Sequence, residues 1–337
     1  MATRGVLSAR MFALVAAGIL LALAPAALSP YSLITLCYAL VFSIACLGLN
    51  LLLGTTGLLS LGHAAYFGVG AYAGAFVYRF SAVNSFEIYL LAGVFCATVL
   101  AAVIGFFCVR ATKIHFTILT LAFAMMVHSL FISGAIFRLF GPLGWALYLL
   151  GGGSMYIPRL TILGTEYAPG MFIPVFYYVI VIAFVGSTFL LWTIGRSPFG
   201  NALRAIRDNE TRAVHIGIPV RQYRWYAFIL SGVFLGLAGA LYGQLTRQIT
   251  PEQLHWLFSA KLVLATVLGG MRDFLGPVLG AFVFEALEEF ALRWTTLHNM
   301  VLGLLLITVI FLFPRGLAGA VTALATLMQR LGTHVSR

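Results

Sequence analysis

The sequence contains very little charge for its length. Only 9% of its 337 residues are charged, whereas 62% are hydrophobic. Soluble domains carry about a quarter charged residues, so this composition excludes an ordinary soluble protein. Apolar runs reach the roughly 20 residues that an α-helix needs to cross a bilayer, and no run shows the residue alternation of a membrane barrel. The sequence therefore predicts an all-α polytopic membrane protein.

The sequence also lacks the motifs of common catalytic, nucleotide-binding and metal sites. It has no GxxxxGK[ST], HExxH or GxSxG motif, and its four cysteines show no CxxC spacing. His115 and His128 share an apolar run without a neighbouring carboxylate, so we interpret them as structural. We expect no enzymatic activity, and no metal or cofactor bound by this chain.

Acidic residues are scarcer than basic ones. Nine Asp and Glu stand against twenty Lys and Arg, and the acidic residues fall almost entirely in predicted loops or at helix ends. Transporters driven by protons or sodium usually hold an ionisable group at membrane depth, and none stands out here. Cytoplasmic loops of membrane proteins retain basic residues, so we attribute the positive excess to the lipid bilayer and expect no nucleic-acid partner.

A series of apolar segments predicts about eight to ten transmembrane or half-spanning helices in a single domain over residues 1–337. The segments are 11–28, 31–53, 57–78, 88–109, 114–137, 172–194, 225–243, 259–270, 274–290 and 299–313. The first also fits a signal peptide, although its length favours a retained span. The distribution of basic residues places both termini in the cytoplasm and makes 259–290 two short crossings or a re-entrant hairpin.

Residues 196–224 form a polar, arginine-rich island between two apolar runs. They hold six of the eighteen arginines. Ser197 fits an N-cap and Pro198 fits the first helical position, while Gly217 and Pro219 end the helix. This most positive loop is expected in the cytoplasm. We predict that its charged helix contacts a partner protein, with a helix lying on lipid head groups as the alternative.

Two glycine-containing segments, 53–63 and 268–277, interrupt apolar runs in the two halves of the chain. A break frees backbone N–H and C=O groups that lipid cannot satisfy, so it must face protein or a water-filled cavity. Paired breaks in two related halves therefore indicate a transport pathway, with close glycine packing between helices as the alternative. The candidate pathway residues are Thr55, Thr56, Ser60, His63, Gly269, Gly270 and Gly276.

Several ordered blocks resemble the permease subunits of branched-chain amino acid ABC importers, the LivM type. They are GLNLLLGTTGLLSLGHAAYFG at 48–68, FTILTLAF at 116–123, the segment 197–218, VLGGM at 267–271, GPVLGA at 276–281 and FPRGL at 313–317. Two departures concern the outer face. The segment 151–159 lacks the family's usual Asn/Asp-Gly, and Ser259-Ala260-Lys261 stands where the family often has an acidic residue.

The resemblance implies a permease that moves branched-chain or related amino acids inward by alternating access, with urea or short amides as near relatives. It implies a second, related permease, two cytoplasmic ATPase subunits that bind the ATP, and a periplasmic or extracellular binding protein. The location it implies is the inner membrane of a bacterial cell. An ion-coupled secondary transporter is the remaining alternative.

The resemblance also gives the arginine-rich island a role. The island corresponds to a coupling helix, with Ala202, Leu203 and Ile206 facing a cleft on the ATPase. The residues assigned to this coupling are Pro198, Gly200, Ala202, Leu203, Arg204, Ile206, Arg207, Glu210 and Gly217.

Overall fold

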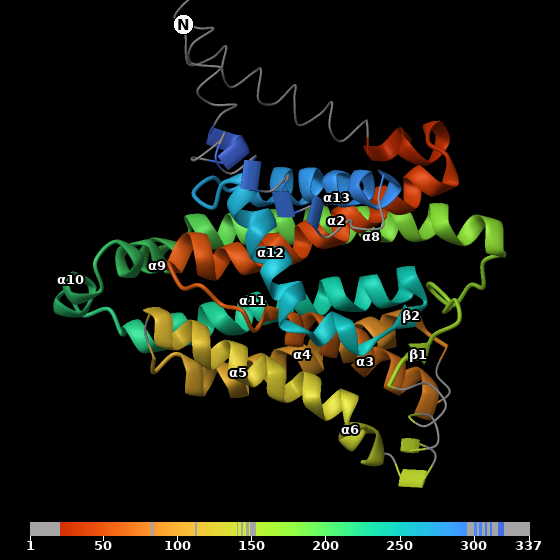
Figure 1. The fold of residues 1–337 in the computed structure, drawn as a ribbon, viewed down its shortest axis with the longest axis horizontal. Coiled ribbons are helices and arrows are strands. Elements are labelled where there is room, and N and C mark those ends of the chain that lie inside the picture. The colour runs from red at the N-terminus through yellow and green to blue at the C-terminus, as the bar shows by residue number, and fades with distance from the viewer. Residues whose placement is uncertain are drawn as a thin grey trace, which may run out of the picture.

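The computed structural model is a bundle of helices (Figure 1). It describes residues 21–81, 84–111, 113–139, 141–142, 144–145, 148, 153–294, 300–301, 303–304, 307–308, 311 and 316–319. The predicted spans 11–28 and 299–313 lie partly outside the described residues. The placement of the two termini is likewise outside them.

Most helices begin and end close to the predicted spans. They are α2 (Pro30–Asn50), η1 (Leu51–Thr56, a π-helical turn), α3 (His63–Ser81), α4 (Phe86–Cys108), α5 (Lys113–Ile132), α6 (Ala135–Arg138), α8 (Pro169–Arg196), α9 (Pro198–Asp208), α10 (Glu210–His215), α11 (Val220–Thr246), η2 (Pro251–Leu254, a 3₁₀ turn), α12 (Trp256–Gly269) and α13 (Gly276–Trp294). Within the described ranges, five helices are long and apolar enough to cross a membrane. The predicted all-α polytopic membrane class is confirmed.

The two ends of the bundle differ in character. At one end, the short strands β1 (Met155–Tyr156) and β2 (Gln248–Ile249) pair antiparallel. Helices α9 and α10 project at the opposite end (Figure 1). We refer to these as the strand end and the α9–α10 end.

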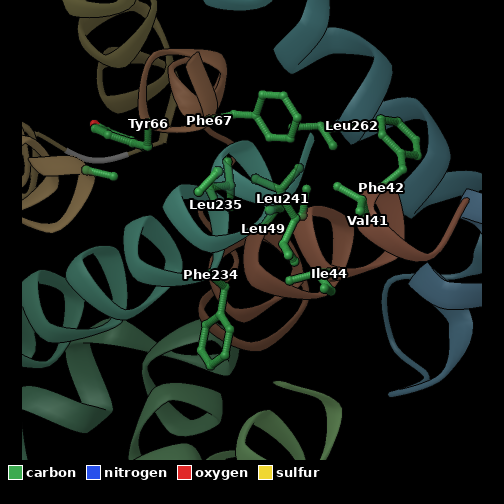
Figure 2. Packing of buried hydrophobic residues seen from close by; sticks show 14 of the residues in the cluster. Val41, Phe42, Ile44, Leu49, Tyr66, Phe67, Phe234, Leu235, Leu241 and Leu262 are labelled. Atoms are coloured by element: carbon green, nitrogen blue, oxygen red, sulfur yellow. The ribbon is translucent and has the colours of Figure 1, made fainter. Parts of the chain in front are cut away.

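Helices α2 and α11 form the buried centre. The most apolar stretches of α2–η1 and α11 are 83% and 67% buried, against 28%, 33% and 22% for α4, α5 and α8. The central pair packs closely because Gly48 of α2 leaves room for Phe234 and Leu235 of α11 (Figure 2). A Cβ atom at position 48 would lie 2.9 Å from the Phe234 Cβ.

The outer helices are apolar on their exposed sides as well. Leu91 and Phe95 of α4 and Ile182 and Phe189 of α8 are large hydrophobic side chains that remain mostly exposed. A helix that is hydrophobic all round is either buried in protein or surrounded by lipid. The exposed faces of α4 and α8 are therefore suited to lipid contact.

Helices α12 and α13 form an antiparallel hairpin, as predicted for 259–290. Lys261 pairs with Glu288 at its open end. At the closed end, a Cβ atom on Gly269 would lie 1.8 Å from the Gly276 carbonyl oxygen. Glu289 accepts hydrogen bonds from Tyr31 and Thr35, so the open end lies beside the start of α2.

The closed end of this hairpin makes a testable demand on residue size. We expect Gly269→Val to lower the thermal stability of the detergent-solubilised chain, because the new side chain meets backbone atoms that cannot move aside. Overpacking of this kind costs about 1–3 kcal/mol or more. Gly186→Val is the matched control, since nothing lies within 4 Å of a Cβ placed there on α8. Equal melting temperatures for the two variants would contradict this packing.

Candidate functional site

The two predicted breaks meet inside the bundle. After the π-helical turn η1, the chain is non-helical from Gly57 to Gly62, and α3 begins at His63. A Cβ atom on Gly54 would lie 2.2 Å from the carbonyl oxygen of Met271, which follows α12. The first break therefore touches the second through backbone atoms, and position 54 tolerates only glycine.

The first break leaves backbone carbonyl groups that need new partners. The Gly54 oxygen accepts a hydrogen bond from Arg207 Nη1 of α9 at 2.6 Å. Thr56 Oγ1 donates to the Leu51 oxygen at 2.9 Å. Broken helices are tolerated at membrane depth when neighbouring groups satisfy the freed backbone in this way. One consequence is that α9 is attached directly to the break.

A chain of hydrogen bonds holds the other side of the first break. Ser60 Oγ lies 2.8 Å from His63 Nδ1, and His63 Nε2 lies 2.8 Å from Ser231 Oγ of α11. Ser231 donates to the Gly48 oxygen, so its own oxygen is left to accept from His63. This assigns a neutral histidine with its proton on Nε2. The chain fastens the start of α3 to α11 and α2.

The structure separates the predicted pathway residues into two groups. Thr56, Ser60 and His63 are fully buried, and their side chains are hydrogen-bonded to the protein. Thr55 lines a cavity of about 200 Å³. The glycines of the second break form the turn of the α12–α13 hairpin, where Gly270 has a φ of +108° that favours glycine.

The arginine-rich island folds as two helices instead of the single helix predicted. Ser197 caps α9 by accepting from the Gly200 amide, and Pro198 occupies the first turn. Asn209 then adopts an extended conformation and caps α10 through the Arg212 amide. An Asn side chain competes for backbone hydrogen bonds in this way, which splits the island at that residue.

The predicted orientation of α9 is wrong. Leu203 and Ile206 are 0% and 2% exposed and face the interior of the protein, and Ala202 is half-buried. Residues three apart share one helix face, and here that face packs against the bundle. The exposed hydrophobic side chains of the island are Val214 and Ile216, at 55% and 68%.

The other predicted coupling residues stabilise the shape of the island. Gly200 sits so close to the end of α8 that a Cβ would lie 2.4 Å from the Gly195 oxygen. Glu210 accepts two hydrogen bonds from Arg224 of α11, at 2.7 and 2.8 Å. Gly217 has a φ of +86°, which ends α10. Arg204 donates to Asn201 Oδ1 at 2.5 Å.

A cavity of about 970 Å³ opens at the strand end. Its wall is largely aromatic, with Phe42 of α2, Phe67 of α3 and Phe258 of α12 in mutual contact. Tyr31, Tyr38 and Tyr242 also line it, together with Leu257 and Leu292. The cavity thus offers a broad apolar surface with phenolic groups.

Both signs of charge line the same cavity. Lys261 pairs with Glu288, and Arg293 pairs with Glu289 at 2.8 Å. Glu252 and Glu285 line it without an ion-pair partner in the part of the chain that the structure describes. The cavity can therefore bind an ammonium group and a carboxylate at once.

Sequence reasoning placed Glu285, Glu288 and Glu289 near the outer surface without assigning them to a site. A signal was present, because carboxylates at i, i+3 and i+4 share one helix face and acidic residues are scarce in this chain. Lys261 was noted only as a departure from the family pattern. Among the described residues, no group of three His, Cys, Asp or Glu side chains could hold a metal ion.

Comparison with known proteins agrees with this architecture. The family model described as branched-chain amino acid transport system / permease component matches residues 31–310. The high-affinity branched-chain amino acid transport permease proteins LivM of Escherichia coli and Salmonella typhimurium are each 26% identical over 300 residues, covering 82% of this chain and 68% of theirs. No solved structure matches the chain.

A shorter similarity links the chain to a second kind of permease subunit. The probable branched-chain amino acid transport permease protein LivH of Methanocaldococcus jannaschii is 26% identical over 151 residues, covering 42% of this chain and 46% of its own. The resemblance expected from the sequence blocks is confirmed by the family match over most of the chain. The chain belongs to the family of permease components of branched-chain amino acid transport systems.

Proposed function

We propose that this chain is one of two permease subunits of an ABC importer, and that the strand-end cavity receives a branched-chain or related amino acid on its way inward. The named relatives are amino acid permeases of this kind. The chain lowers the barrier to crossing and performs no covalent chemistry. Two separate ATPase subunits bind the ATP that drives the cycle, and a binding protein delivers the solute.

The observation that carries this proposal is the composition of the strand-end cavity. Glu252 and Glu285 are free to accept an α-ammonium group, and Lys261 or Arg293 can receive an α-carboxylate. The Phe42–Phe258 wall then contacts an apolar side chain. Ligand sites commonly combine a mostly apolar surface with a few polar groups that fix orientation. A neutral amide such as urea would use neither set of charges.

The charge distribution supports an orientation in a bacterial inner membrane. The α9–α10 end carries the arginine-rich island, and basic loops are retained in the cytoplasm. The strand end then faces outward, where a binding protein can release its solute into the cavity. With this orientation the α12–α13 hairpin enters and leaves from the outer side.

The exposed part of the island is the docking surface for an ATPase. Val214 and Ile216 are hydrophobic side chains at the tip of a polar segment. Water-exposed apolar groups surrounded by charges are typical of protein contacts. A push on this tip reaches the first break through α9, because Arg207 is bonded to the Gly54 carbonyl.

The cavity can be tested by removing one unpaired carboxylate. In proteoliposomes holding the complete importer, Glu285→Gln should raise the KM for leucine uptake about tenfold or more, since losing a charge-assisted hydrogen bond costs about 1.5–3 kcal/mol. Glu166→Gln removes an exposed charge outside the cavity and should leave KM unchanged. Unchanged KM in Glu285→Gln would contradict the site. Uptake by the purified chain alone, driven by a sodium or proton gradient, would overturn the importer itself.

The docking surface can be tested separately. The double variant Val214→Asp/Ile216→Asp should lose binding to the ATPase subunits and at least tenfold of the transport-linked ATPase activity, because charges cannot enter an apolar contact without cost. Val214→Leu/Ile216→Leu preserves the apolar surface and should retain both. Co-purification and ATPase assays measure the outcome, and normal ATPase binding by the Asp variant would rule out this surface.

A further inference from the structure

A second cavity lies at the α9–α10 end, where the two breaks meet. It has a volume of about 200 Å³ and lies between the ends of α2 and α8, the helix α9 and the residues that follow α12. Four arginines line it: Arg196, Arg204, Arg207 and Arg272. They come from three separate segments of the chain, so the fold brings them together.

These positive charges are not balanced within the cavity. None of the described residues that line it is a carboxylate. Arg207 pairs with Asp208 at 3.0 Å, but Asp208 is 68% exposed and does not line the cavity. Arg196 stacks over Trp192 at 4.1 Å, which leaves its charge in place. Like charges repel when they are gathered around a confined space, so an anionic occupant stabilises this arrangement.

An independent observation points to an occupant. Asn50 lines the same cavity and is only 8% exposed, yet its Oδ1 has no hydrogen-bond partner within the described ranges. Buried polar atoms are nearly always hydrogen-bonded, so a ligand or water is expected beside one that is not. A ligand with anionic oxygens and a nearby hydroxyl would satisfy both the guanidinium groups and this carboxamide.

The position of the cavity selects a lipid as the source. Trp192 and Arg196 stand at the end of α8, and the exposed Phe189 and Leu190 continue along that helix. Trp and Arg at the end of an apolar helix are typical of the head-group region of a membrane. Acyl chains can follow the apolar face of α8 while the head group enters the cavity.

We propose that this cavity binds the phosphate group of an anionic phospholipid such as phosphatidylglycerol, with Arg204 and Arg272 as its main ligands. Arginine binds phosphate through paired N–H groups, and basic pockets between membrane helices accept anionic head groups. The bound lipid connects α9 to the second break, in parallel with the Arg207–Gly54 hydrogen bond. Its role in coupling rests on the proposed import function, whereas the binding itself does not.

The test is direct binding to the full chain, without transport. Purified protein in phosphatidylcholine nanodiscs is titrated with phosphatidylglycerol, and bound lipid is counted by native mass spectrometry alongside the melting temperature. We expect one retained phosphatidylglycerol and a higher melting temperature in the unmodified chain. Arg204→Gln/Arg272→Gln should weaken this binding at least tenfold. Arg204→Lys/Arg272→Lys, which keeps the charge but not the paired donors, should weaken it less and is the variant to use if the Gln pair does not fold.

The control removes two arginines at the same end but outside the cavity. Arg110 and Arg221 both lie over the Phe106 ring and do not line the cavity, so Arg110→Gln/Arg221→Gln should bind lipid normally. An equal loss in this control would show general attraction to basic residues and overturn the site. Stabilisation by inorganic phosphate equal to that by the lipid would overturn the lipid as occupant. Lipid binding without any leucine uptake would leave this site standing and contradict only the proposed import.

Discussion

The hydrogen bond from Arg207 to the Gly54 carbonyl joins the two features on which this permease depends. Gly54 lies in a π-helical turn, and a carbonyl freed at that depth must find a partner within the protein. The partner comes from α9, the helix that leads to the exposed tip of the island. The same glycine touches the Met271 carbonyl, so one position connects the island with both helix breaks.

This arrangement places two cavities at opposite ends of a rigid centre. The strand-end cavity is large, aromatic and lined by both signs of charge, whereas the α9–α10 cavity is small and lined by arginine. Between them, α2 and α11 pack through glycine, and the His63 chain fastens α3 to both. A tightly packed interior does not deform gradually. Movement of α9 is therefore expected to shift the breaks as units.

Sequence reasoning recovered the features that depend on local chemistry. The apolar runs predicted most helices, Ser197 and Pro198 marked the start of α9, and both breaks occur where glycine interrupts the pattern. The contact between the breaks and the face that α9 buries depend on tertiary packing, which periodicity alone does not specify. Leu203 and Ile206 would suit either an ATPase or the bundle, and the bundle buries them. The strand-end cavity draws its lining from five helices, so no single segment reveals it.

The central claim is that force on the island reaches the helix breaks through Arg207. The most direct measurement is the number of leucine molecules imported per ATP hydrolysed by the complete importer with Arg207→Gln. The account predicts that ATP hydrolysis continues while this ratio falls at least tenfold, and that Arg207→Lys restores part of it because lysine can still donate to the Gly54 carbonyl. A ratio unchanged from that of the unmodified importer would contradict the account.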